Sequence, residues 1–214
     1  MSSKISNKHY REFLDRGIIE IITEKHIAEA LENVKGRHSS QGRALLIVMY
    51  YSGARPIECL ALRAKDIQKS GRRYISIFFP SSKGGMARTL EFKITPMILE
   101  LWRYRARFQD DVLIFWNYRS KRKRVRTLKS GKFRELKYPA DTLTYHFKRW
   151  FKGVLDDPIP PYYLRHSRIS QLAMTGEVSE EQLRVWKGSK TAESVRPYTH
   201  LTKKTLRKIT RYLK

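Results

Sequence analysis

Cysteine and long apolar runs are nearly absent from this sequence. Cys59 is the only cysteine among 214 residues, so the chain cannot form an intramolecular disulfide or a zinc site built from several cysteines. The longest apolar run, residues 44–51, is too short to span a bilayer, and the N-terminus lacks the apolar core of a signal peptide. These absences predict an intracellular protein that does not enter a membrane.

Acidic residues are also scarce: 20 Asp and Glu face 45 Lys and Arg, which gives a formal net charge of +25 and a pI near 10.3. A polyanionic partner is the simplest explanation of such an excess. Hydrophobic residues make up 41% of the chain and aromatic residues 12%, so a folded domain is expected and not a basic tail. An HExxH pair, a phosphate-binding Gly-Lys-Ser loop and paired carboxylates are all missing, which predicts no metal or cofactor and leaves a metal-dependent nuclease or an NTPase without support.

No linker rich in Gly, Ser or Pro divides the chain, and no internal repeat is visible. We predict a short N-terminal segment, 1–23, and one domain over 24–214, mainly α with a small antiparallel β-hairpin (α+β). Strand composition over 74–79 and 88–92 flanks the turn signal Lys83-Gly84-Gly85. Apolar spacing, caps and breakers predict helices over 24–36, 40–52, 96–107, 139–155, 162–175 and 179–187, and a further helix that begins at Pro56.

Residues 119–137 concentrate positive charge around a Ser130-Gly131 break. Two compatible interpretations are open: a solvated loop or hairpin, or an arm that follows the phosphates of a nucleic acid. Interleaved apolar residues favour the second. The candidate DNA-binding residues are Arg119, Lys121, Arg122, Lys123, Arg124, Arg126, Lys129 and Lys132.

Three segments carry residues suited to cutting a phosphodiester: 52–60 (SGARPIECL), 162–166 (YYLRH) and 188–200 (GSKTAESVRPYTH). A tyrosine that attacks phosphorus generates negative charge, which protein cations must balance when no metal takes part. Guanidinium groups suit that task because they stay charged and hold two phosphate oxygens at once. In order and context, the three segments resemble the catalytic domain of the tyrosine recombinases, the phage integrase family.

The resemblance implies a role for each matched residue. Arg55 and Arg165 would hold the scissile phosphate. Tyr198 would attack it to form a 3′-phosphotyrosyl bond, and Lys83 would protonate the departing 5′-hydroxyl. That bond would conserve the phosphodiester energy, so neither metal nor ATP would be required. Taken singly, each residue is explained by an ordinary salt bridge, a polar turn or packing, but their order and context favour catalysis.

Two positions depart from the family pattern. Tyr162 replaces the histidine that precedes the second arginine, and Ser189 replaces the histidine or tryptophan that follows the glycine. Both can donate a hydrogen bond to phosphate, but neither can become a cation or act as a base at neutral pH. Glu58 is expected to orient the first corner by pairing with a cation or a backbone amide. Lys187 and Lys190 flank Ser189 and are candidates to supply the missing positive charge, and Trp186 is a candidate to cover the site. His166 and His200 are candidates to replace the missing histidines, although the family pattern makes both positions structural.

The sequence therefore predicts a site-specific DNA recombinase or integrase that acts on double-stranded DNA in the cytoplasm or nucleoid of a prokaryotic host. A type IB topoisomerase-like enzyme and a non-catalytic DNA-binding protein remain alternatives. The resemblance implies a tetramer on two DNA sites, which is compatible with a monomer in solution.

Residues 1–23 are too few for the second DNA-clamping domain of most family members. The amphipathic segment 203–214 would dock on a neighbouring subunit or on its own core. Scarce asparagine is typical of proteins from hot environments, and the replaced histidines are most familiar among archaeal and viral integrases.

Overall fold

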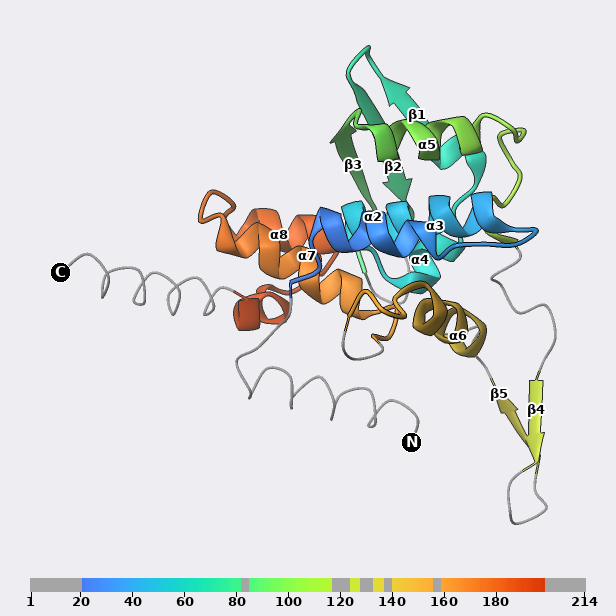
Figure 1. The fold of residues 1–214 in the computed structure, drawn as a ribbon. Helices are drawn as coiled ribbons and strands as arrows, with labels where there is room; N and C mark the ends of the chain where they lie inside the picture. The colour runs from blue at the N-terminus through green and yellow to red at the C-terminus, as the bar shows by residue number, and fades with distance from the viewer. Residues whose placement is uncertain are drawn as a thin grey trace.

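The computed structural model describes residues 21–81, 85–116, 124–127, 133–136, 140–155 and 159–198, with 124–127, 133–136 and 140–142 described by their backbone alone. Figure 1 shows the order and arrangement of the elements. The helices are α2 (Glu24–Glu32), α3 (Ser39–Ser52), α4 (Pro56–Leu60), α5 (Pro96–Arg105), α6 (Ala140–Trp150), α7 (Tyr163–Met174) and α8 (Glu180–Lys187), with 3₁₀ turns η1 (Ala64–Asp66) and η3 (Ala192–Ser194). The strands are β1 (Ile67–Ser70), β2 (Tyr74–Phe79), β3 (Arg88–Lys93), β4 (Arg124–Thr127) and β5 (Phe133–Leu136).

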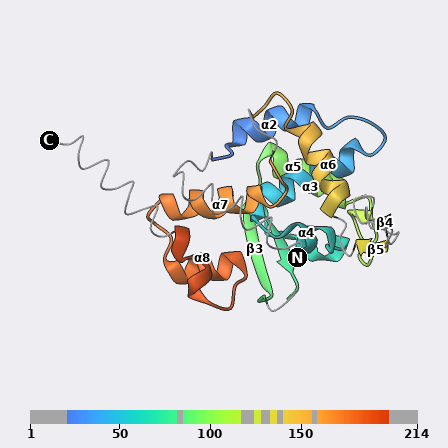
Figure 2. The ribbon, with the colours of Figure 1, turned by 90° about the horizontal axis from the view of Figure 1, so that it is seen from below.

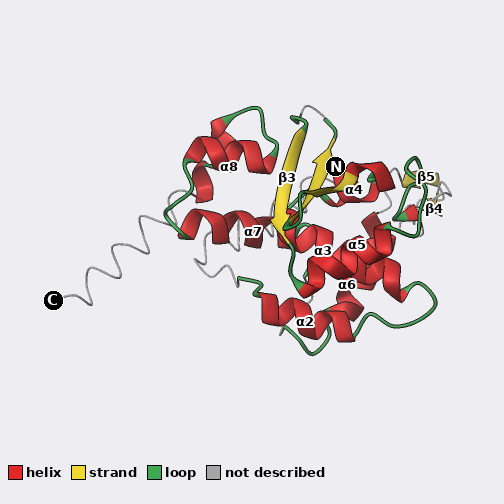
Figure 3. Ribbon diagram, turned by 90° about the horizontal axis from the view of Figure 1, so that it is seen from above, coloured by secondary structure: helices red, strands yellow, loops and turns green. Residues whose placement is uncertain are grey.

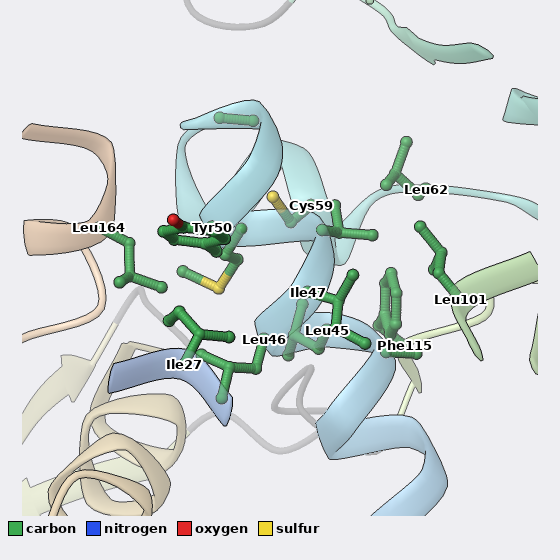
Figure 4. Close-up of a cluster of buried hydrophobic side chains, with 14 of the residues drawn as sticks. Ile27, Leu45, Leu46, Ile47, Tyr50, Cys59, Leu62, Leu101, Phe115 and Leu164 are labelled. Carbon is green, nitrogen blue, oxygen red and sulfur yellow. The ribbon is translucent and has the colours of Figure 1, made fainter. Parts of the chain in front are cut away.

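Helix α3 forms the centre of the core. Its run Leu45–Leu46–Ile47–Val48–Met49 is buried on every side, because α2, α5 and α7 all pack against it. Figure 4 shows how side chains from α2, α4, α5 and α7 meet those of α3, with Ile27, Cys59 and Leu164 among them. Burial of this apolar surface is the main term that stabilises the fold.

The antiparallel sheet β1–β2–β3 packs beside this helical core, with α5 next to it in Figure 1. Residues of β3 alternate between buried and exposed, which places Arg88, Leu90 and Phe92 on the inner face. Strands β2 and β3 confirm the predicted hairpin, with Ile77 paired to Leu90 in register. Strand β1 was not predicted; it pairs with β2 along its whole length.

Local capping chemistry sets most helix ends where the sequence predicts them. The Thr95 hydroxyl accepts a hydrogen bond from the amide of Ile98, and Pro96 occupies the first turn of α5. Gly53 adopts a left-handed conformation with φ of 57° and ends α3. Helix α2 ends at Glu32, four residues before the predicted boundary, since Asn33 caps it and the chain then turns.

The fold is mainly α with a small antiparallel sheet, as predicted, and Figure 3 shows this balance of helix and strand. Strands β4 and β5 form a separate antiparallel hairpin in the basic segment, in which Arg124 and Arg126 belong to β4. The other six candidate DNA-binding residues lie outside the described residues, as does the amphipathic segment 203–214. Of the helices in the described ranges, none is long and apolar enough to cross a membrane.

Candidate active site

The corner between α3 and α4 presents Arg55. The Ser52 hydroxyl donates to the carbonyl of Val48 at 2.6 Å and accepts from the amide of Ala54 at 3.0 Å, which fixes the turn on both sides of Gly53. Arg55 then caps α4, and its side chain remains 29% exposed. The corner therefore holds a cation at the surface with a rigid backbone behind it.

Glu58 orients this corner, as predicted, by pairing with both a backbone amide and cations. Its carboxylate accepts hydrogen bonds from the amide of Arg55 at 2.8 Å and from Arg55 Nη1 at 2.8 Å. It also accepts from Arg88 Nη2 at 2.9 Å, and the Glu58 and Arg88 side chains are only 1% and 2% exposed. Glu58 is thus a buried anion shared between two arginines.

Arg88 is a residue of the site that the motifs did not reveal. It projects from the inner face of β3, its guanidinium lies 4.8 Å from the centre of the Phe79 ring, and it reaches toward the turn at Gly188. The sequence did contain a signal for Arg88. Strand alternation places it on the same buried face as Leu90 and Phe92, and a buried cation needs an anionic or hydrogen-bonding partner.

Arg165 joins the first corner to the end of α8. Its Nη1 donates to the carbonyl of Gly53 at 2.9 Å and its Nη2 to the carbonyl of Lys187 at 2.6 Å. The residue is 1% exposed, and its Nε has no hydrogen-bond partner among the described residues. Two motifs that lie more than 100 residues apart in the sequence therefore meet at one guanidinium.

The turn after α8 lies against the sheet. Gly188 is left-handed with φ of 65°, and its carbonyl accepts a hydrogen bond from the amide of Met86 at 3.1 Å. Figures 2 and 3 both place α8 beside β3. Ser189 is buried in this turn, where its Oγ accepts from the hydroxyl of Ser194 at 2.7 Å.

Tyr198 lies at the end of this segment with its ring 1% exposed. Its hydroxyl is 2.5 Å from Nδ1 of His166, and the two rings stack with an interplanar angle of 17°. The ammonium of Lys187 lies 4.9 Å from the centre of the Tyr198 ring and donates to the carbonyl of Ser194. A phenol, an imidazole and an amine are therefore clustered next to Arg165.

Over residues 20–205 the sequence matches the phage integrase family. The chain belongs to this family. No curated protein matches the sequence significantly.

Solved structures with the phage integrase fold are similar to it. A XerH site-specific recombinase bound to difH substrate in a pre-cleavage complex has a TM-score of 0.58 at 18% identity, over 82% of this chain and 48% of that chain. The XerA recombinase has a TM-score of 0.57 at 18% identity, over 90% of this chain and 62% of that one. The chain thus spans about half to three fifths of the length of these proteins, and the likeness establishes the shared fold.

The structure brings four residues of the phage integrase motifs into one region: Arg55, Arg165, Ser189 and Tyr198. Tyr162 caps α7 at the edge of the cluster, 39% exposed, with its ring 4.9 Å from that of His166. Lys83 lies outside the described residues, in the part of the sequence between β2 and β3.

Two neighbours of the motifs make contacts that the sequence did not reveal. Trp186 packs against the cluster that contains Tyr198, its indole donates to the carbonyl of Ser52 at 2.9 Å, and its ring lies edge-on to Phe92. His166, which the family pattern suggested to be structural, contacts the tyrosine hydroxyl directly. That contact joins residues 32 positions apart, so no local pattern could have signalled it.

Burial and charge in this cluster of residues shift several pKa values. Burial opposes ionisation of Glu58, but the hydrogen bond and charge of Arg88, with the Arg55 amide, outweigh it and lower the Glu58 pKa to about 2. Burial, followed by the charges of Lys187 and Arg165, lowers the His166 pKa to about 3. Burial, followed by Arg165 and Arg55, lowers the Lys187 pKa to about 7. The imidazole of His166 is therefore neutral at pH 7, next to a strongly cationic pocket.

Proposed function

We propose that this chain is the catalytic domain of a site-specific DNA recombinase that breaks and rejoins DNA through a phosphotyrosyl bond to Tyr198. The observation that carries the proposal is that Arg165 bonds to the Gly53 carbonyl in the Arg55 corner and to the Lys187 carbonyl beside Tyr198. The guanidinium of one candidate phosphate-binding arginine thus links the corner that carries the other to the end of α8, near the candidate nucleophile. The catalytic domain extends over 24–214 in this proposal, preceded by the segment 1–23.

The proposed chemistry needs cations more than any other group. As the tyrosine oxygen bonds to phosphorus, negative charge grows on the nonbridging oxygens, and Arg55 and Arg165 stabilise it. Tyr162 and Ser189 would add hydrogen bonds from their hydroxyls. Lys83 would give a proton to the departing 5′-oxygen. The arginines would take the place of a metal, and the phosphotyrosyl bond would conserve the phosphodiester energy, so that neither a metal nor ATP is required.

Access to the tyrosine is part of this proposal. The residue is 1% exposed, so no phosphate reaches its oxygen in the arrangement described above. The chain that covers this oxygen would therefore have to open when DNA binds, with Tyr198 and His166 kept in contact. Double-stranded DNA is the proposed partner, held by the net charge of +25 and assembled with four protein copies across two sites.

A suicide substrate tests the nucleophile. A nicked DNA that loses its short cleaved strand traps the covalent complex, which survives denaturation by SDS. We expect a trapped band with the wild-type chain in EDTA and without ATP, none with Tyr198→Phe, and an unchanged band with Tyr145→Phe, which alters a tyrosine that is 58% exposed on α6. The DNA affinity of Tyr198→Phe should stay within about threefold of wild type, since a buried phenol contributes little to a charge-driven interaction.

The results separate the proposal from its alternatives. A wild-type chain that binds DNA without forming any covalent band would indicate a DNA-binding protein that does not cut. A band that persists in Tyr198→Phe would mean that another residue attacks. Relaxation of supercoiled DNA without exchange of strands between two sites would indicate a topoisomerase-like activity.

A further inference from the structure

The contact between His166 and Tyr198 has the geometry of a proton-transfer pair. His166 lies in the first turn of α7, directly after Arg165, and its Nδ1 is 2.5 Å from the tyrosine oxygen. The rings are nearly parallel, with centroids 6.1 Å apart. This distance is slightly shorter than the range of about 2.6–3.2 Å expected between a general base and the hydroxyl it deprotonates.

The tyrosine needs such a partner. A phenol has a pKa near 10, so at neutral pH almost all of it is protonated and a weak nucleophile. Arg55 and Arg165 hold their protons at this pH and can only donate. Lys187 directs its ammonium at the Ser194 carbonyl and faces the ring of Tyr198. Among the described residues, the neutral imidazole at the hydroxyl itself is the group placed to accept the proton.

We propose that His166 is the general base that takes the Tyr198 proton during strand cleavage. This assignment rests on the function proposed above. In the step, the Oη–H proton moves to Nδ1 while the Oη–P bond forms. The P–O5′ bond breaks, and the departing oxygen takes a proton from Lys83. In rejoining, the 5′-hydroxyl gives its proton back to the Lys83 amine as its oxygen attacks phosphorus, the Oη–P bond breaks, and the imidazolium returns its proton to the tyrosine oxygen.

The charges around His166 make this base dependent on DNA. Burial disfavours the protonated form of the imidazole, and so do the charges of Lys187 and Arg165, while the ring of Tyr162 contacts the imidazole edge-on. A scissile phosphate at Arg165 would bring an anion into the same pocket and favour the imidazolium. The tyrosine proton should therefore stay in place in the protein alone and move only when the substrate is bound.

The test measures single-turnover cleavage of the suicide substrate by His166→Asn from pH 6 to pH 10. Asparagine keeps a polar group near Nδ1 but cannot accept the proton. We expect the rate at pH 7 to fall about 10²- to 10⁴-fold, the typical contribution of general acid–base catalysis, with DNA affinity within about threefold of wild type. The deficit should shrink as the pH approaches the tyrosine pKa near 10. The matched variant His146→Asn, on α6, should cleave at the wild-type rate.

A second substrate distinguishes the loss of a general base from the loss of a general acid. Sulfur in place of the bridging 5′-oxygen leaves without being protonated, so this substrate should restore cleavage by Lys83→Ala and leave His166→Asn slow. A His166→Asn rate within threefold of wild type would overturn the proposal. So would a deficit that is constant with pH, or one that the sulfur substrate removes, because each fits a role other than accepting the tyrosine proton.

Nitrogen NMR of the histidines gives a readout that needs no cleavage. We expect His166 in the DNA-free protein to be neutral, with its proton on Nε2 and with Nδ1 accepting the bond from Tyr198. A proton on Nδ1 would overturn the assignment whatever the chain does to DNA. If the wild type forms no covalent band, both the proposed function and the assignment of His166 as general base are wrong. If the wild type forms a normal band and His166→Asn cleaves at an unimpaired rate, only the assignment of His166 is wrong.

Discussion

Replacing Arg88 by methionine should destabilise the protein by about 3 kcal/mol at pH 7. Arg88 and Glu58 form an ion pair at 2.9 Å with both side chains almost fully buried. The difference between the ordinary carboxyl pKa of 4.5 and the Glu58 value of about 2 corresponds to about 3 kcal/mol of net stabilisation of the ionised form. Removing one partner of a buried pair typically costs about 3–5 kcal/mol, which agrees. Methionine keeps most of the volume, so a cavity adds little.

Urea unfolding monitored by circular dichroism measures this change, and a double-mutant cycle isolates its cause. Glu58→Gln removes the buried anion, so the variant carrying both Glu58→Gln and Arg88→Met should be more stable than the two single losses predict, by more than about 1 kcal/mol. An Arg88→Met protein within about 1 kcal/mol of wild type, or additive single changes, would refute the reasoning.

The acid side of the stability curve supplies an independent check. A carboxyl whose pKa is lower in the folded state contributes stability that is fully present above its unfolded value, here 4.5, and is lost as the pH falls through about 2. In Arg88→Met, burial opposes ionisation of Glu58 with less compensation, so its folded pKa should rise. The loss of stability between pH 4.5 and pH 2 should therefore be smaller in the variant than in wild type.

Two further predictions use neighbouring residues as matched controls. Gly188→Ala should cost at least about 1 kcal/mol more than Gly176→Ala: both glycines have positive φ, but an added Cβ at Gly188 would lie against Arg88 Nη1 and 2.8 Å from its Cζ, whereas at Gly176 it meets nothing within 4 Å. Ser167→Ala should cost about 1–3 kcal/mol because its buried Oγ accepts from the Ile22 amide at 2.8 Å, whereas Ser170→Ala should be neutral or stabilising because its buried Oγ has no hydrogen-bond partner in the described structure. Chemical unfolding measures the free energy of unfolding of both pairs of variants. Equal losses of stability within a pair would contradict the packing described above.

The parts of the site that short motifs encode could be predicted from sequence. Gly53 breaks α3 because only glycine adopts its φ of 57° without strain, so the position of Arg55 at a corner followed from the sequence. Strands β2 and β3 were visible from their composition. Strand β1 (IQKS) could not be predicted, because it has a single apolar residue and no alternation of apolar and polar residues. Its pairing with β2 and the burial of Ile67 hold it in the sheet.

The remaining residues of the site depend on tertiary contacts. Helical periodicity puts Tyr162 and His166 one turn apart, and their rings do contact each other. It does not say that His166 faces a tyrosine 32 residues later, because that depends on how α7, α8 and η3 pack. The role of Arg88 required knowing which face of β3 is buried and that Glu58 lies beneath it.

The electrostatic balance of the site explains why it suits an anionic substrate. The guanidinium groups of Arg55, Arg88 and Arg165 and the amine of Lys187 converge, and among the described residues Glu58 is the carboxylate that pairs with the first two of them. Burial and mutual repulsion lower the pKa of the Lys187 amine to about 7 and hold His166 in its neutral form. An entering phosphate would relieve this repulsion, so part of the binding free energy would come from correcting an unfavourable charge arrangement already present in the fold. The same anion would make His166 more basic and thereby connect recognition of DNA to activation of Tyr198.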